Sequence, residues 1–159
     1  MRYLAIFFAI SLSVFLSSCE EEMEVWDFAS IEFTVCVQNA DGDNLLDKDV
    51  PDNILDEDIY LEYNGKNMEM EVWNGSRYNP AYWYGLILQE DGVNMPCLHI
   101  GQFDVLSRHD ECVLHIGGRS YKMAFDAEIK KHDVAITFHF DGKSHKHPNT
   151  KPTYYIVVE

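Results

Sequence analysis

Aromatic side chains flank a polar loop near the middle of the chain. Trp73 precedes this loop, Tyr78 lies within it and Trp83 follows it. Exposed aromatic faces can hold a pyranose ring, and the neighbouring Asn and Arg side chains would add hydrogen bonds at its rim. The alternative is that these rings fill the core, where each would bury about 150–250 Å². We predict a glycan-binding site formed by Trp73, Tyr78 and Trp83.

An acidic segment precedes these aromatic residues and could bind a metal ion. Asp41, Asp43 and Asp47 fall within one short loop, and a hard cation such as calcium takes several oxygen ligands from a loop. The spacing departs from the EF-hand pattern, because the Gly comes second rather than sixth and the twelfth residue is Asp rather than Glu. The alternative is a turn-rich connection whose carboxylates face water while Leu45–Leu46 point inward. We predict no required cofactor, with calcium at Asp41, Asp43 and Asp47 as the main metal hypothesis.

The histidines and the known catalytic motifs provide little support for a metal site or an active site. His145 and His147 would share one face of a strand, but a zinc site needs three or four converging ligands and no spacing supplies a third. The chain has no Gly-x-Ser-x-Gly elbow, no His-Glu-x-x-His motif and no Gly-rich phosphate loop. We therefore predict no catalytic residue and a protein that is not an enzyme. A hydrolase that uses the acidic loop is the alternative, and it requires a pocket with converging buried ionisable groups.

The charge of the chain limits its partners. The 159 residues contain 12 Lys and Arg against 27 Asp and Glu, a net charge of −15. Binding to nucleic acid or to an anionic lipid surface needs a basic face, so both are disfavoured. The hydrophobic content of 47% is too high for a disordered chain. The chain is therefore predicted to fold as a globular domain without a nucleic-acid partner.

The N-terminus has the layout of a secretory signal peptide. Arg2 precedes the apolar run Leu4–Leu16, and small residues lead to Cys19. The run is too short for a transmembrane helix, which needs about 20 residues. The residues 16–19 resemble the lipobox of bacterial lipoproteins, and this resemblance implies that residues 1–18 are removed and that Cys19 carries lipid. The alternative is an ordinary signal peptide with an incidental Cys.

The residues that follow Cys19 suggest where the protein resides. Glu20–Glu22 resembles the surface-export signal of Bacteroidetes lipoproteins, although a simple solvated tether would look the same. We expect a lipidated Cys and acidic tether over residues 19–29, and a location at the outer membrane or cell surface. The membrane would then be a partner only through the lipid, which anchors by burying methylene groups worth about 0.8 kcal/mol each.

The remainder of the chain, residues 30–159, is predicted to be one β domain. From Ile31 to Val37 apolar residues alternate with polar ones, which is typical of a strand with one buried face. Further strands are expected at 82–88, 98–104 and 153–158, and no segment shows a sustained helical stripe. Eight or nine strands without a helix predict an antiparallel sandwich of two sheets. A closed β-barrel is the alternative.

Three hairpins can be predicted from turn residues and register. Asn64-Gly65 should join strands 59–63 and 66–70, and it brings the apolar side chains to one face. A second turn centred on Gly118-Arg119 would pair Ile116 with Tyr121. A third turn at Asp141-Gly142 would place His145 opposite Phe138, so we expect the return strand to bulge or to leave the sheet early.

Three cysteines remain after lipidation: Cys36, Cys97 and Cys112. An odd number leaves at least one thiol unpaired or paired with another chain. We predict a Cys97–Cys112 bond because both residues lie in the central strands, with free buried thiols as the alternative.

The chain as a whole resembles small Bacteroidetes lipoproteins of uncharacterised function. The resemblance rests on Leu16–Glu22, Asp41–Asp47, Tyr63–Lys66 and Ile116–Gly118. It implies an immunoglobulin-like or transthyretin-like sandwich and carries no functional residue with it. We therefore expect a lipid-anchored, non-catalytic binding module with a glycan as the leading ligand. The alternative is a structural or partner-binding subunit of an envelope complex, which should expose an apolar face or a sheet edge.

Overall fold

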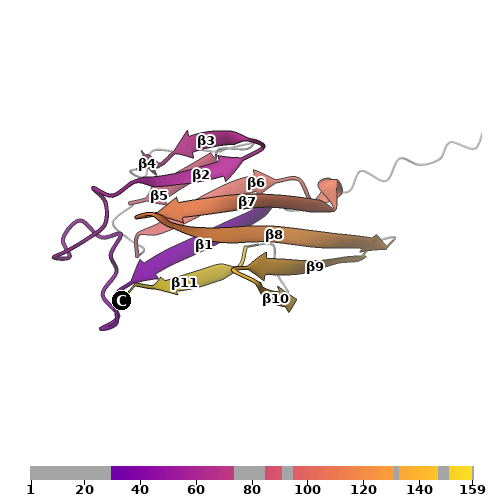
Figure 1. Ribbon diagram of the computed structural model, residues 1–159. Helices are drawn as coiled ribbons and strands as arrows, with labels where there is room; N and C mark the ends of the chain where they lie inside the picture. The colour runs from indigo at the N-terminus through magenta and orange to yellow at the C-terminus, as the bar shows by residue number, and fades with distance from the viewer. Residues whose placement is uncertain (1–29, 74–84, 91–94, 131–132, 147–150, 159) are drawn as a thin grey trace, which may run out of the picture.

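The computed structural model describes residues 30–73, 85–90, 95–130, 133–146 and 151–158. The predicted signal peptide, the predicted lipidation site Cys19 and the whole predicted acidic tether, residues 19–29, fall outside these ranges. The described residues form two facing β-sheets and one short 3₁₀ turn, Val105–Ser107, with no α-helix among them (Figure 1). None of the described segments is a helix that could span a bilayer.

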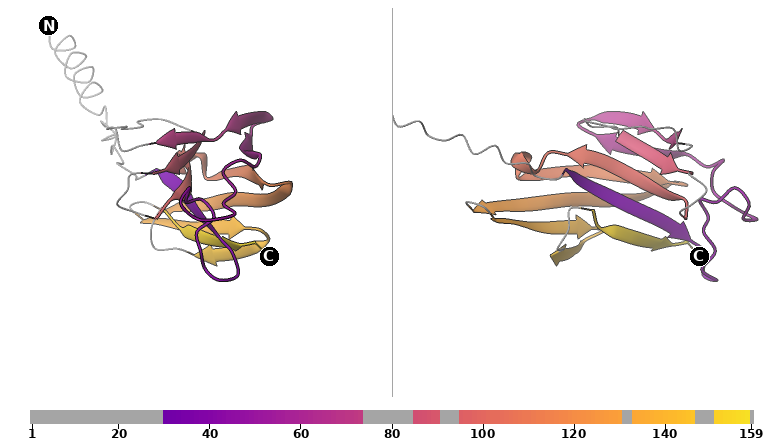
Figure 2. Two further views of the ribbon diagram at one scale, coloured as in Figure 1. Left: turned by 90° about the vertical axis from the view of Figure 1, so that its left-hand side faces the viewer. Right: turned by 180° about the vertical axis from the view of Figure 1, so that it is seen from behind.

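The two sheets have five and six strands and do not close into a barrel, so the predicted sandwich is confirmed (Figure 2). The five-stranded sheet has the order β11(Thr153–Val157), β1(Ile31–Gln38), β6(Cys97–Phe103), β5(Gly85–Gln89), β4(Glu71–Trp73). The six-stranded sheet has the order β10(Lys143–Lys146), β9(Asp133–Phe140), β8(Arg119–Lys130), β7(His109–Ile116), β2(Ile59–Tyr63), β3(Lys66–Glu69). Most neighbours are antiparallel, but β11 pairs in parallel with β1 and β4 pairs in parallel with β5.

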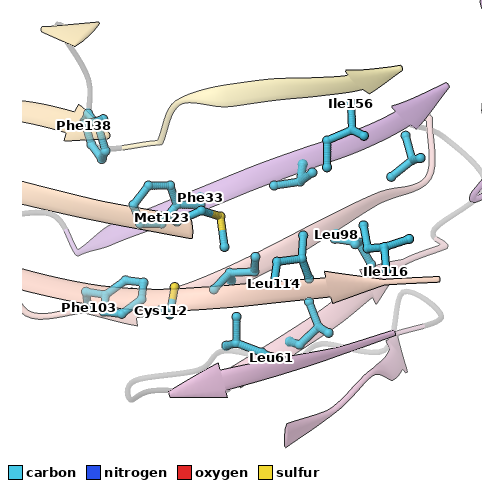
Figure 3. Close-up of a cluster of buried hydrophobic side chains, with 14 of the residues drawn as sticks. Phe33, Leu61, Leu98, Phe103, Cys112, Leu114, Ile116, Met123, Phe138 and Ile156 are labelled. Atoms are coloured by element: carbon cyan, nitrogen blue, oxygen red, sulfur yellow. The ribbon is translucent and has the colours of Figure 1, made fainter. Parts of the chain in front are cut away.

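The core lies between the sheets and is built from alternate residues of their strands (Figure 3). Phe33 of β1 packs edge-on against Phe103, at 5.8 Å between ring centroids, and against Phe138 of the opposite sheet, at 5.5 Å. All three rings are almost completely buried. Edge-to-face packing of this kind adds about 0.5–1.5 kcal/mol per pair beyond the burial of apolar area, so these rings fix the two sheets against each other.

Strand β1, which lies between β11 and β6, is covered on both faces, whereas the alternation predicted one buried face. Its core residues Ile31, Phe33, Val35 and Val37 are buried as expected, but Cys36 on the other face is also only 1% exposed. The alternation of polar and apolar residues therefore identified the strand but not its surroundings. A buried disulfide explains the covering at this position.

That disulfide joins Cys36 to Cys97, so the predicted Cys97–Cys112 bond is wrong. The register pairs Val35 with Leu98, which places Cys36 directly opposite Cys97 on the neighbouring strand, with 4.6 Å between Cα atoms. Cys112 lies in the other sheet and belongs to the core cluster as a free thiol. The side chains of Cys97 and Cys112 thus point to different layers of the sandwich.

The first predicted hairpin is confirmed and the second is shifted by two residues. Asn64 and Gly65 have φ angles of 51° and 70° and join strands in which Tyr63 pairs with Lys66. The second turn is Gly117-Gly118, with φ angles of 52° and 77°, so Ile116 pairs with Arg119 rather than with Tyr121. A tight two-residue turn requires positive φ at both positions, which two glycines adopt without strain and Arg does not.

The third hairpin turns at Asp141-Gly142 as predicted, but its return strand stays in register. Lys143 pairs with Phe140 and His145 pairs with Phe138, so the expected bulge or early departure is wrong over these residues. The reason is that β10 is the edge strand of its sheet. The imidazole of His145 is therefore exposed at the side of the sandwich and does not enter the dry core.

Candidate functional site

Little of the predicted glycan site lies within the described residues. Trp73 ends β4 at one edge of the five-stranded sheet and is half-buried, and its carbonyl accepts a hydrogen bond from the N–H of Glu90 at 2.9 Å. Tyr78 and Trp83 lie outside the described residues. The three side chains proposed to bind a sugar therefore remain a prediction.

The acidic loop uses its polar side chains to hold its own turns. The side-chain oxygen of Asn39 accepts hydrogen bonds from the backbone N–H groups of Asp41 and Asp43, and the Asp43 carboxylate accepts one from Asn39. The Asp47 carboxylate accepts a hydrogen bond from the N–H of Asp49 at 2.9 Å. Across the described ranges, no three His, Cys, Asp or Glu side chains converge as a metal site. The loop matches the alternative of a turn-rich connection, and Leu45–Leu46 is buried beneath it.

A Ser, two His and an Asp form a polar cluster on the outer face of the six-stranded sheet. The Asp126 carboxylate lies 2.8 Å from Nδ1 of His109 and 2.7 Å from Nε2 of His139, whose Nδ1 lies 2.8 Å from Oγ of Ser144. Hydrogen bonds from His109 and then from His139 lower the pKa of Asp126. The Asp126 side chain is 57% exposed, and exposed pairs of this kind contribute only about 0–1 kcal/mol. The cluster therefore fits a solvated surface network better than an activated nucleophile.

A buried carboxylate joins the strands at the other face of the sandwich. Glu32 of β1 is 7% exposed, and its oxygens lie 3.0 Å from Nδ1 of His99 and 3.3 Å from Nζ of Lys151. His99 belongs to the neighbouring strand β6, and Lys151 precedes β11. The carboxylate is therefore paired by groups from both flanking elements, which fits a role in holding β11 against the sheet.

On one side of the sandwich, β11 and β10 form the edges of the two sheets (Figure 1). A depression lies there, lined by side chains of both sheets. It is an open groove with a volume of about 540 Å³. We call it the β11 groove. Its lining residues are Arg119, Tyr121, Phe140, Asp141, Lys143, His145 and Tyr154–Val157. The groove thus receives side chains from both sheets, including the last four residues of β11.

Three stacked rings form the inner wall of the β11 groove. Phe140 lies parallel to Tyr154, with 4.4 Å between centroids and 7° between planes, and Tyr121 continues the stack at 6.3 Å from Phe140. Burial raises the pKa of Tyr154 to about 12. Because Phe140 and Tyr154 cover each other's faces, the wall offers ring edges and little free face for a sugar.

The charge of the β11 groove is opposite in sign to that of the chain. Arg119, Lys143 and His145 line it, and Asp141 is the one acidic residue in its lining. Neither Arg119 nor Lys143 forms an ion pair with another residue that the structure describes. In a chain with a net charge of −15, basic side chains without an ion-pair partner among the described residues lie beside an apolar wall, which favours an anionic ligand there.

The outer edge of β11 presents to this groove backbone groups that no other described strand pairs with. The hydrogen bonds from Thr34 N–H to the Pro152 carbonyl and from Val158 N–H to the Gln38 carbonyl fix the phase of the ladder with β1. In a parallel ladder alternate residues bond to the same neighbour, so the backbone groups of Tyr155 and Val157 point away from β1. No other described strand pairs with β11.

The side chains of Tyr155 and Val157 are also exposed, by 57% and 56%. Sequence reasoning predicted the strand at 153–158 but not this environment. The residues alone gave no signal for the parallel pairing with β1 or for the edge position, since both depend on partners distant in the chain.

Comparison of the chain with protein-family models, with curated proteins and with solved structures finds no match.

Proposed function

We propose that this chain is a lipid-anchored protein of the cell envelope whose β-sandwich head docks a partner protein, without catalysis, in the β11 groove. The observation that carries the proposal is that no described strand covers the outer edge of β11. Tyr155 and Val157 expose their side chains on that edge and direct their backbone N–H and C=O groups away from β1.

The composition of the edge strands supports this choice. Soluble proteins protect sheet edges with charged residues, Pro or bulges, because an open edge pairs with other chains. Three of the four described edge strands carry charged residues: β10 reads KSHK, β3 reads KNME and β4 reads EVW. By contrast, β11 reads TYYIV and has neither a charge nor a Pro. An edge that lacks this protection is what a docking strand requires.

The envelope location rests on the N-terminus and on the disulfide. The lipobox resemblance at Cys19 and the acidic run Glu20–Glu22 support a lipid anchor and export to the outer membrane or cell surface. The Cys36–Cys97 bond supports an oxidising compartment, because disulfides persist outside the cytosol. Mass spectrometry of the membrane fraction tests the anchor: the mature chain should begin at an acylated Cys19, and an uncut or unmodified N-terminus contradicts it.

Glycan binding at Trp73, Tyr78 and Trp83 is the competing proposal. It draws no support from the β11 groove, where Phe140 and Tyr154 stack on each other. A thermal-shift screen against a glycan panel separates the two proposals. Stabilisation by a glycan that survives substitution of Tyr155 favours the sugar site, and no response to any glycan favours protein docking.

Site-specific photo-crosslinking on intact membranes tests the docking proposal directly. A photo-reactive residue placed at Tyr155 should give one discrete protein adduct, and Val157→Lys should weaken it by placing a charge at the edge. The matched control is the same residue at Val72, which is equally exposed at 57% on the opposite edge strand of the sheet. The same adduct from Val72, or none from Tyr155, contradicts docking in the groove.

A further inference from the structure

We infer that the partner presents an extended acidic segment, which adds to β11 as a new edge strand. This inference rests on the proposed docking function and specifies the chemistry of the docked segment. Its three supports are the backbone phase of β11, the division of the β11 groove into two faces, and the charge of the groove lining.

The backbone phase gives the segment its hydrogen bonds. Tyr155 and Val157 each direct one N–H and one C=O away from β1, so an added strand can bond to both residues. The last four of the five residues of β11, Tyr154–Val157, line the groove and span about 10 Å at about 3.3 Å per residue. Strand addition of this kind takes affinity from main-chain bonds and specificity from alternate side chains.

The two faces of the sheet predict an alternating pattern in the added strand. Residues opposite each other in neighbouring strands share a face. Side chains opposite Tyr155 and Val157 would lie on the outer face beside exposed apolar groups. Side chains opposite Tyr154 and Ile156 would point toward the six-stranded sheet. There Arg119 and Lys143 line the groove.

The charges of the groove select acidic residues for these inward positions. Arg119 and Lys143 have no ion-pair partner among the described residues. A second copy of the same chain is a poor occupant, because pairing of two β11 edges would bring together two sets of these basic side chains. The expected segment alternates acidic with apolar residues.

Peptide titration of the mature lipidated chain in neutral detergent tests the inference. The probe is a capped, fluorescently labelled hexapeptide that alternates Val with Glu, and its binding is measured by anisotropy. A second peptide replaces Glu by Lys. A third keeps Glu but carries N-methyl groups on alternate residues, which removes the peptide N–H groups that would donate hydrogen bonds to the β11 carbonyls. Both altered peptides should bind at least tenfold more weakly than the acidic one.

Substitutions of Arg119 and Lys143, compared with substitutions of two basic residues outside the groove, test the role of charge in the protein. Arg119→Gln combined with Lys143→Gln should weaken the acidic peptide about fivefold at low salt, as expected for two exposed charge pairs. Lys66→Gln combined with Arg108→Gln removes the same charge outside the groove lining and should leave binding within twofold. Circular dichroism of both variants confirms that the fold is retained.

Several outcomes overturn the inference. If the Lys peptide binds as tightly as the acidic peptide, the groove does not select for charge. If the N-methylated peptide binds as tightly as the acidic peptide, the segment does not add as a strand. A concentration-dependent dimer that Tyr155→Lys disrupts would assign the edge to a second copy. If the acidic peptide does not bind while the crosslink at Tyr155 persists, strand addition fails and docking stands. If the crosslink is also absent, the proposed function fails as well.

Discussion

Breaking the Cys36–Cys97 disulfide should destabilise the head by about 4 kcal/mol. The bond closes a loop with a sequence separation of 61. In the chain-entropy description a loop of this size restricts the unfolded chain by about 14 cal/mol/K, which is about 4 kcal/mol at 25 °C. Since domains are stable by only about 5–15 kcal/mol, this loss would be a large share of the total.

Urea unfolding followed by Trp fluorescence measures this effect. The oxidised chain is compared with the same chain under reductant and with the double variant Cys36→Ala, Cys97→Ala, and both should lose a similar free energy of unfolding. The matched control is Cys112→Ala, which keeps the disulfide and should therefore keep its sensitivity to reductant. A loss below about 1 kcal/mol on reduction would refute the entropic reasoning, and insensitivity of the Cys112→Ala variant to reductant would refute the pairing.

Three further predictions follow from ionisable groups. Burial raises the pKa of the Cys112 thiol, so a thiol alkylating reagent should label it only after unfolding, and rapid native labelling would count against a sealed core. Burial, with the hydrogen bond that Tyr63 donates to Asp110, raises the pKa of Tyr63 to about 12, and burial alone does so for Tyr154. Since the folded state holds these phenol protons more tightly than the unfolded state, the free energy of unfolding should fall as the pH rises from about 10 to about 12. Tyrosinate absorbance and circular dichroism monitor this change. Phe substitution at both positions should reduce the fall. The pKa of Asp126 is lowered in the folded state, so its stabilising contribution is present above the ordinary carboxyl pKa and is lost as the pH falls through the folded-state pKa. Asp126→Asn should therefore be slightly destabilising at neutral pH and indistinguishable from the parent in acid. Urea unfolding at each pH measures the difference.

The local parts of this fold could be predicted from the sequence. The hairpin at Asn64-Gly65 was predictable because its two residues favour positive φ and the flanking apolar pattern agrees in register. The turn at Gly117-Gly118 was found, but its centre was placed one residue late. The error moved every pair by two positions, which leaves each side chain on the same face and so left the pattern of burial unaffected.

The contacts between distant segments could not be predicted in this way. Alternation assigns Cys36 to a face of its strand, but the choice between Cys97 and Cys112 as partner depends on which strand lies beside β1. The β11 groove depends on the same kind of information, because β11 reaches β1 from the far end of the chain. Hydrophobic patterning fixes faces and leaves the order of strands open.

The predicted glycan site and the proposed docking site differ for a physical reason. Trp73, Tyr78 and Trp83 stood out because large aromatic residues close together in sequence are conspicuous. In the β11 groove the notable feature is an edge strand that carries no charged residue or Pro and exposes Tyr155 and Val157. An unprotected edge becomes visible only when the strand order is known.

Hydrogen exchange of individual β11 amides in the free, monomeric protein is the most direct test of an open docking edge. The ladder with β1 predicts that the amides of Tyr154 and Ile156 are protected, while those of Tyr155 and Val157 exchange at rates close to those of an unstructured chain. Equal, strong protection of all four amides in the monomer would mean that the edge is already covered. That result would contradict the docking function at its central point.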